Sequence, residues 1–312
     1  MAGWLTGWGL DLVAGVQHWR SGPADGVATL LHHAGHETGY LLLLPLIYWC
    51  VNRPLGRRLL VVFLGSVWLN ARLKQLCHLP RPWMVSSRVH ALVTEGGSGL
   101  PSGHVQFSTA VLGLAAVTAR QARVWGAVVA FVALVGWSRL YLGLHYPQDV
   151  LAGFACGALT AAVAARWLAG AEAWLARQDL GVQLLVVTAV PAGLACAAVV
   201  RPGFDPAASQ GLWSALGTLL GVGLGFVAEA RWVRFEPATT AARQASCYLL
   251  GLVVLVALRL VTGVLAAHLG ADEAMRVARY AVLGLWVAAG APAAFVGLGW
   301  AGRRPTVETT ES

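Results

Sequence analysis

Lys74 and Arg81 form the first pair of residues whose types and spacing indicate chemistry. They lie in the segment KQLCHLPRP, and Lys74 is the only lysine in the chain. Seven residues turn an α-helix by about 700°, close to two full turns, so we expect both cations to project from one helical face. Such a pair binds the oxygens of a phosphate group. A cation that only reaches the membrane interface is the alternative for Lys74.

The second candidate is PSGH, Pro101–His104, at the end of a glycine-rich loop. Ser102 is a good N-cap and Gly103 lets a ligand approach the backbone, so a helix is predicted to begin here. The free N–H groups at a helix start bind anions. His104, one residue inside the helix, is placed to give a proton to a leaving group. A capped helix start with a polar interface residue is the structural alternative.

The third candidate is SRLYLGLHYPQD, Ser138–Asp149, which contains Arg139, His145 and Asp149. Pro147 suits the first turn of a helix. If the turn before it is helical, Asp149 can hold one imidazole nitrogen of His145 and leave the other nitrogen free. This is the arrangement of a nucleophile or base with its orienting carboxylate. A structural His-Asp pair at a helix start is the alternative.

The elements that must position these motifs are membrane helices. The 312-residue chain is 57% hydrophobic and 12% charged, whereas about 25% charged residues are typical of soluble domains. Its apolar residues come in blocks long enough for a helix to cross a hydrocarbon core of roughly 30 Å. We predict an all-α fold, a polytopic membrane helical bundle of about nine transmembrane helices. The predicted spans are residues 35–51, 58–78, 104–120, 125–142, 149–168, 181–200, 211–230, 245–266 and 280–300.

Arginines in the loops predict the orientation of the bundle. More of them fall in inward-facing loops if the N-terminus is outside and the C-terminus is inside. The end of the second span, the start of the third and the junction of the fourth and fifth then open on the same outer side. Three cations, a helix start and two histidines would meet there, which is typical of a phosphate site. The net charge of +8 is spread over short loops, so no nucleic-acid partner is predicted.

The chain divides into four predicted segments. Residues 1–34 form an N-terminal interfacial helix and lead-in, and 35–170 form the catalytic core. Residues 171–302 form additional transmembrane helices, and 303–312 form a disordered tail. The interfacial helix is expected to be apolar on the face that carries Trp4, Leu5, Trp8 and Leu12.

No metal site, cofactor or disulfide is predicted. The five cysteines fall singly, without a CxxC pair. His32 and His36 are four residues apart in HHAGHE, a spacing that suits two metal ligands on one helix face. Because no third ligand lies at a matching spacing, we interpret this pair as the start of an interfacial helix.

Together these residues resemble the three-part signature of the type 2 phosphatidic acid phosphatase superfamily, which also includes vanadium haloperoxidases. The matching residues are Lys74 with Arg81 and Pro82, PSGH at 101–104, and Ser138 and Arg139 with His145 and Asp149. The resemblance covers roughly residues 35–165. It implies a metal-independent phosphatase core formed by helices 1 to 6 of the bundle.

The resemblance also implies a role for each motif residue. His145 would attack phosphorus to form a phosphohistidine, Asp149 would orient it, and His104 would protonate the leaving alcohol and then activate water. A covalent step of this kind divides one difficult displacement into two. The residues implied to bind the phosphoryl group are Lys74, Arg81, Ser102, Gly103 and Arg139.

The substrate is left open by these motifs. The layout of the whole chain is similar to the glucose-6-phosphatase branch, whereas Asp149 follows the lipid-phosphatase form of the third motif. We expect a lipid phosphate or isoprenoid (di)phosphate, because a protein in the membrane meets such a substrate at the outer interface. A soluble sugar phosphate, contacted by Glu95 and Ser98 of the outer loop, is one alternative. A non-enzymatic lipid transporter with the same fold is another, and the oligomeric state stays open. The expected location is the plasma (inner) membrane, with the active site on the outer face.

Overall fold

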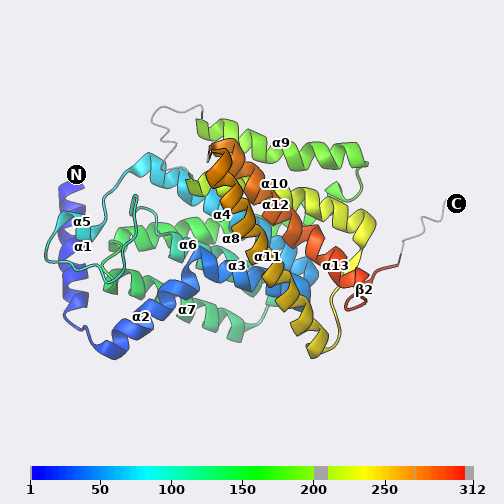
Figure 1. Ribbon diagram of the computed structural model, residues 1–312. Coiled ribbons are helices and arrows are strands. Elements are labelled where there is room, and N and C mark those ends of the chain that lie inside the picture. Colours follow the sequence, from blue (N-terminus) through cyan, green and yellow to red (C-terminus); the bar gives the residue numbers. More distant parts are fainter. Residues whose placement is uncertain (1, 200–209, 271, 306–312) are drawn as a thin grey trace. The chain divides into compact units, whose positions relative to one another are not determined.

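The computed structural model describes residues 2–199, 210–270 and 272–305, with side chains from residue 7 onward. Within these residues the chain is helical apart from loops and one short antiparallel ribbon (Figure 1). The predicted all-α fold is confirmed. The elements are α1 (Ala2–Gln17), α2 (Gly22–Gly35), α3 (Glu37–Leu46), η1 (Ile47–Val51), α4 (Arg53–Cys77), α5 (Pro82–Val85), α6 (Gly103–Ala119), α7 (Ala122–Tyr141), α8 (Pro147–Leu175), α9 (Leu180–Val199), α10 (Gln210–Ala228), η3 (Glu229–Val233), β1 (Phe235–Glu236), α11 (Ala241–Leu269), α12 (Glu273–Leu285), η4 (Trp286–Gly290), α13 (Ala291–Gly297) and β2 (Gly302–Arg303).

Among the described residues, seven helical segments are long and apolar enough to cross a membrane. Two shorter apolar helices cover Glu37–Val51 and Gly103–Ala119. Each predicted span coincides with one of these segments, so the chain is a polytopic membrane bundle as predicted. The seven longer segments are Arg53–Val85, Ala122–Tyr141, Pro147–Leu175, Leu180–Val199, Gln210–Val233, Ala241–Leu269 and Glu273–Gly297.

Internal contacts divide the chain into two compact units. The first contains residues 1–41, residues 58–172 and the start of α10 up to Leu212. The second contains residues 42–57, residues 173–199 and the chain from Trp213 onward. All three sequence motifs belong to the first unit.

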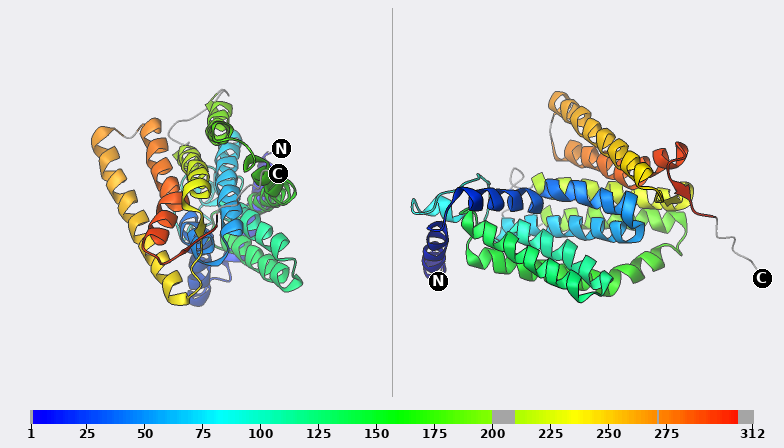
Figure 2. Two further views of the ribbon diagram at one scale, coloured as in Figure 1. Left: turned by 90° about the vertical axis from the view of Figure 1, so that its right-hand side faces the viewer. Right: turned by 90° about the horizontal axis from the view of Figure 1, so that it is seen from below.

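In the first unit, α6 and α7 form a helical hairpin and α2 packs on both of them. Leu31 of α2 joins Val105, Val132 and Val135 in one buried cluster. α6, α7 and α8 run along one another (Figure 2). This packing brings the start of α6, the end of α7 and the start of α8 to the same end of the unit.

Two glycines let α8 lie directly against α6. A Cβ atom at Gly153 would meet the carbonyl oxygen of Ser102, and a Cβ atom at Gly157 would meet the carbonyl oxygen of Gln106. Small residues at such positions allow the backbones of membrane helices to approach closely. The approach sets the first turn of α8 beside the PSGH segment.

The N-terminal region is built from two helices, α1 and α2. Trp8 is exposed, as a residue at an interface would be, whereas Val13 and Gln17 on another face of α1 are buried. Trp4 and Leu5 lie outside the described side chains. α2 is not only a connection to the bundle, because it packs on α6 and α7 within the first unit.

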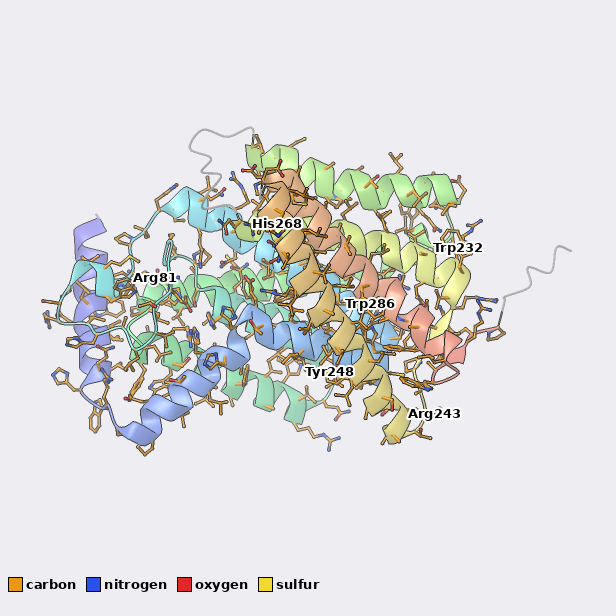
Figure 3. The ribbon with its side chains drawn as sticks, viewed as in Figure 1. Arg81, Trp232, Arg243, Tyr248, His268 and Trp286 are labelled. Carbon is orange, nitrogen blue, oxygen red and sulfur yellow. The ribbon has the colours of Figure 1, made fainter. Side chains whose placement is uncertain are left out.

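In the second unit, α11 packs on α12, and β1 pairs with β2 in an antiparallel ribbon. The Arg53 guanidinium forms a buried ion pair with Glu229, which also accepts a hydrogen bond from the backbone N–H of Phe235 at 2.8 Å. Arg243, Tyr248 and His268 lie along α11 (Figure 3). Since Arg303 is part of β2, the ordered chain extends into the predicted tail; residues 306–312 lie outside the described part.

Candidate active site

The segment after α4 does not continue as a helix. α4 ends at Cys77, and Arg81 has an extended backbone just before α5. Lys74 remains in the last turn of α4. The prediction that both cations project from one helical face is therefore wrong. Pro80 and Pro82 lack backbone donors and disfavour helical geometry in the residue before each of them.

The Arg81 side chain, labelled in Figure 3, is 1% exposed, and all three of its nitrogens donate hydrogen bonds. Its Nη1 atom donates to the Leu144 carbonyl at 3.2 Å and lies 3.3 Å from Nε2 of His145. Its Nε and Nη2 atoms donate to the carbonyls of Gly97 and Gly96 at 3.3 and 3.1 Å. These bonds hold the guanidinium in one orientation beside the His145 imidazole.

His145 lies in the turn between α7 and α8 and is fully buried. Its Nδ1 atom is 3.5 Å from Oδ2 of Asp149, and that oxygen accepts a hydrogen bond from the backbone N–H of Tyr146 at 2.9 Å. Burial is the main cause that lowers the pKa of His145 well below its usual value, and the cations Arg81 and Lys74 add to it. The ring is therefore neutral near pH 7. Because the Arg81 guanidinium can only donate, Nε2 carries the electron pair and Nδ1, on the side of Asp149, carries the proton, which is the tautomer that a nucleophilic Nε2 requires.

The PSGH segment forms the start of α6. Gly103 is the first helical residue, and Ser102 precedes it with its backbone N–H bonded to the carbonyl of Asp149 at 2.9 Å. Ser102 is buried, and its hydroxyl has no hydrogen-bond partner among the described residues. His104 is 7% exposed in the first turn. A hydroxyl, a helix start and an imidazole thus come together here.

Arg139 lies in the last turn of α7 and is fully buried. Its Nε and Nη2 atoms donate to the Ser138 hydroxyl at 3.2 and 3.1 Å, and its Nη1 atom donates to Nδ1 of His32 at 2.9 Å. The guanidinium is therefore fixed at both ends, as a group must be if it is to hold an oxyanion without reorganising.

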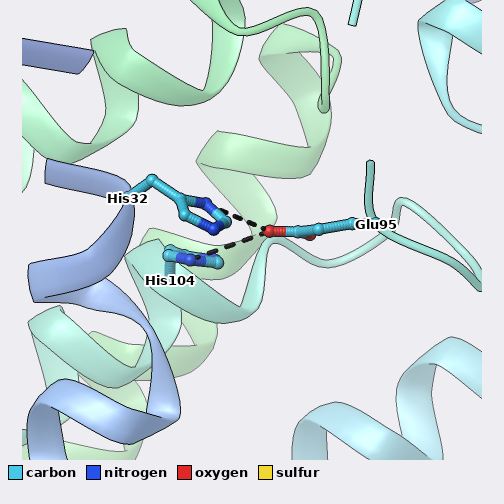
Figure 4. Close-up of side chains that lie close together, drawn as sticks. All are labelled: His32, Glu95 and His104. Atoms are coloured by element: carbon cyan, nitrogen blue, oxygen red, sulfur yellow. Dashed lines mark ion pairs between the residues drawn. The ribbon is translucent and has the colours of Figure 1, made fainter. Parts of the chain in front are cut away.

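The carboxylate of Glu95 lies where these groups converge. One oxygen is 3.0 Å from Nη1 of Arg81. The other is 3.7 Å from Nη1 of Arg139, 3.4 Å from Nδ1 of His32 and 3.8 Å from Nε2 of His104 (Figure 4). An anion thus occupies the place to which two arginines and a helix-start histidine point. The sequence singled out Glu95 only as a possible sugar contact.

His32 is the residue of this group that the sequence interpretation missed. The HHAGHE pattern predicts an interfacial helix start for His32 and His36, but His32 is buried near the end of α2. Its ring stacks on that of His104, with ring centroids 5.0 Å apart and planes inclined by 28°. No spacing along the chain connects residue 32 with 95 or 104, so sequence pattern could not have found it.

His32, Glu95 and His104 also have the composition of a metal site, since their ligand atoms all lie within 4.8 Å of one another. The Nδ1 atom of His32, however, already accepts from the Arg139 guanidinium. A divalent cation at that atom would have to displace a fixed positive charge. The donor set therefore fits an anion better than a metal.

Lys74 lines a cavity of about 650 Å³ on the α4 side of the same loop. Glu37, Asn70, Gln75 and Ser98 also line it, together with several apolar residues. The structure therefore gathers Arg81, Arg139 and His104 around the Glu95 carboxylate, with His145 beside Arg81 and Asp149 beside His145. Lys74 lies in the neighbouring cavity.

Family comparisons cover most of the chain. Residues 55–172 match the PAP2 superfamily, and residues 213–303 match the transmembrane extension of PAP2 superfamily phosphatases. The first match contains all three motifs. His32 lies before it.

Individual relatives match part of the chain. Human sphingosine-1-phosphate phosphatase 2 is 32% identical over an alignment of 133 residues, and the match covers 40% of this chain and 33% of the relative. Human glucose-6-phosphatase 3 is 31% identical over an alignment of 144 residues, and the match covers 38% of this chain and 41% of the relative. A transmembrane PAP2-type phosphatidylglycerolphosphate phosphatase from Bacillus subtilis has a crystal structure similar to 51% of this chain and 83% of its own, with 25% identity and a TM-score of 0.45. The chain thus spans less than half the length of these two curated relatives.

Proposed function

Since this chain belongs to the PAP2 superfamily, we propose that it is a metal-independent phosphatase that hydrolyses a lipid phosphate or an isoprenoid (di)phosphate. The observation that carries the proposal is the convergence of Arg81, Arg139 and His104 on the Glu95 carboxylate, with His145 bonded to Arg81. A carboxylate and a phosphoryl group present similar oxygens to guanidinium donors. The place of Glu95 is therefore the proposed place of the substrate phosphate.

In the first step, Nε2 of neutral His145 attacks phosphorus and the ester P–O bond breaks. The leaving oxygen takes a proton from His104, whose protonated form is favoured by the negative charge of the bound phosphate ester. Arg81 and Arg139 stabilise the charge that builds up on the phosphoryl oxygens, which is the main catalytic contribution in phosphoryl transfer. Asp149 holds the Nδ1 side of His145, so the phosphohistidine keeps one orientation.

In the second step, His104 takes a proton from a water molecule, and the water oxygen attacks phosphorus. The P–N bond breaks, inorganic phosphate leaves, and His145 returns to its neutral form. The unpartnered Ser102 hydroxyl supports a contact to the phosphoryl group in both steps, because a buried hydroxyl without a partner is rare unless a ligand supplies one.

A lipid substrate is preferred because the chain is an integral membrane protein and the membrane supplies such a molecule directly. The similarity to sphingosine-1-phosphate phosphatase 2 supports this choice. A soluble sugar phosphate is the second candidate, supported by the similarity to glucose-6-phosphatase 3 and by the polar residues of the cavity. We further propose that the site opens on the outer face of the plasma (inner) membrane.

Phosphate release by the purified protein in detergent tests the proposal. The panel contains phosphatidic acid, undecaprenyl diphosphate, a sphingoid phosphate and glucose 6-phosphate, with and without a chelator. We expect release from a lipid substrate that the chelator does not reduce. Efficient hydrolysis of glucose 6-phosphate alone would reverse the substrate preference, and loss of activity with the chelator would exclude the metal-free mechanism.

His145→Asn separates an enzyme from a lipid transporter of the same fold. We expect this variant to lose phosphate release, because the nucleophilic nitrogen is gone. Lipid flux that survives in His145→Asn, in a protein that releases no phosphate, would identify a transporter. His33→Asn is the matched control, since His33 is exposed.

A further inference from the structure

We propose that His32 is a positioning residue of the phosphate cradle, where it holds the Arg139 guanidinium and supports the His104 ring. The cradle is defined here as Arg81, Arg139 and His104. The inference deepens the proposed function and rests on it, because a positioning role has meaning only if these groups bind phosphate.

The position of His32 is unusual for a residue outside the three motifs. It comes from α2, which packs on both α6 and α7, the helices that carry His104 and Arg139. Its side chain is 6% exposed, whereas that of the adjacent His33 is exposed. A polar ring buried at this depth is bonded to a specific partner in most proteins.

That partner is Arg139. The 2.9 Å contact joins its Nη1 atom to Nδ1 of His32, and an arginine can only donate, so Nδ1 is the acceptor. Ser138 holds the other two nitrogens of the same guanidinium. His32 is therefore the acceptor that fixes the end of the fork nearest Glu95.

The state of the His32 ring agrees with this role. Burial first and the Arg139 charge second lower the pKa of His32 to about 4. The ring is neutral near pH 7, so Nδ1 keeps a free electron pair for the guanidinium. A charged His32 could not accept this hydrogen bond.

The second contact is with His104. The two rings are stacked with centroids 5.0 Å apart, and both face the same oxygen of Glu95 (Figure 4). Stacking restricts the tilt of the His104 ring, which must point its Nε2 atom at the leaving oxygen. His32 thus acts on the phosphate through Arg139 and on proton transfer through His104.

Two substitutions separate these contacts. His32→Asn keeps an acceptor oxygen close to the position of Nδ1 but loses the stacked ring. His32→Phe keeps the ring but loses the acceptor. His33→Asn and His33→Phe make the same changes one residue away, at an exposed position, and serve as matched controls.

The experiment measures kcat and KM with p-nitrophenyl phosphate and the Ki of orthovanadate, a phosphate analogue, on the full chain in detergent. For His32→Phe we expect KM and Ki to rise by about tenfold or more, as expected for a lost hydrogen bond to a charged group. For His32→Asn we expect a nearly unchanged Ki and a roughly threefold lower kcat, as for a lost aromatic pair. The His33 variants should match the wild type.

An unchanged Ki in His32→Phe would overturn the inference. Equal losses in His32→Asn and His32→Phe would also overturn it, since simple packing does not distinguish an acceptor from a ring. The proposed function fails separately, if the wild type hydrolyses no phosphate ester at all. A wild type that turns over, with His32 variants equal to the His33 controls, refutes only the positioning role.

Discussion

At the residue scale, the Glu95 carboxylate lies between the arginines that the motifs predict as phosphate ligands. Arg81 donates hydrogen bonds to the Gly96 and Gly97 carbonyls, which fix the loop that carries Glu95. A phosphoryl group can reach the same donors only after Glu95 has moved aside. Glu95 therefore competes with every anion that binds the cradle.

Glu95→Gln is predicted to strengthen inhibition by inorganic phosphate. The neutral amide pairs less well with Arg81, and a hydrogen bond to a charged group contributes about 1.5–3 kcal/mol, so we expect a Ki at least tenfold lower. Inhibition constants measured on purified protein test this. Glu273→Gln, at an exposed position on α12, is the control. A Ki that rises in Glu95→Gln would instead make Glu95 a ligand of the substrate.

Two buried histidines outside the membrane-spanning helices, His32 and His145, predict a pH dependence of stability. Folding lowers the pKa of both His32 and His145, so their contribution is complete above the ordinary histidine pKa of about 6.5. As the pH falls below that value, the unfolded chain binds protons that the folded chain does not, and the free energy of unfolding decreases. Thermal unfolding in detergent should show a falling midpoint over this range. The fall should be smaller in His32→Asn, and an identical fall would contradict the assignment.

The same shift predicts the pH dependence of turnover. His145 stays neutral at pH values below the ordinary histidine pKa. Its protonation should therefore not produce an acid limb near pH 6.5 in the pH profile of kcat/KM, which reports the free enzyme. A pH profile of kcat/KM measures it. If an acid limb near pH 6.5 is observed and is lost in a variant that still contains His145, a group other than His145 titrates there.

At the element scale, the site depends on how closely α8 approaches α6. The backbone N–H of Ser102 donates to the carbonyl of Asp149, and the carbonyl oxygen of Ser102 lies against Gly153. The first turns of α6 and α8 are therefore held together. A shift of α8 would separate His145 and Asp149 from the helix start that we propose to bind the phosphate. Helix packing is therefore part of the proposed catalytic geometry.

Gly153→Ala is predicted to destabilise the protein by about 1–3 kcal/mol, as overpacking does. It should also lower kcat, since the Cβ atom presses on the Ser102 carbonyl. Gly170→Ala on the same helix has open space and should be neutral or slightly stabilising. Thermal unfolding and turnover measure both effects. Equal midpoints in the two variants would show that α8 can move away without cost.

The second unit depends on the ion pair between Arg53 and Glu229. Glu229 is fully buried and also bonded to the Phe235 N–H. Removing one member of a buried pair typically costs about 3–5 kcal/mol, so Glu229→Ala should lower the unfolding midpoint strongly. Glu236→Ala removes an exposed carboxylate of the adjoining strand and should change stability by about 1 kcal/mol or less. Similar midpoints would show that the pair contributes little.

At the scale of the whole molecule, the orientation in the membrane decides which compartment supplies the substrate. The loop arginines predict that the loop with Arg88 faces outward and the turn with Arg120 faces inward. Both residues are exposed in the structure. They are suitable positions for labelling.

Single cysteines introduced by Arg88→Cys and Arg120→Cys, in a chain whose own cysteines are replaced by serine, test the orientation. A membrane-impermeant thiol reagent added to intact cells should label the first variant and not the second. Permeabilised cells, in which both should react, are the control. The reverse pattern would put the active site on the inner side.

The sequence by itself determined the features that depend on short stretches of chain. Apolar blocks of membrane-spanning length predicted the helices, and the PSGH segment marked the start of α6. Local patterns suffice there because hydrophobic length, capping and proline geometry act within one or two turns. The same local chemistry explains the error at Arg81, where two prolines outweigh helical periodicity.

Only the tertiary structure decided which side chains share the anion position. His32, Glu95 and Arg139 come from a helix end, a long loop and another helix, and their contacts depend on how α2, α6 and α7 pack. No periodicity along the chain encodes such an encounter. Glu95 acquires its role because it lies among cationic side chains, and His32 acquires its role because burial keeps its ring neutral beside Arg139. Both are properties of the folded molecule.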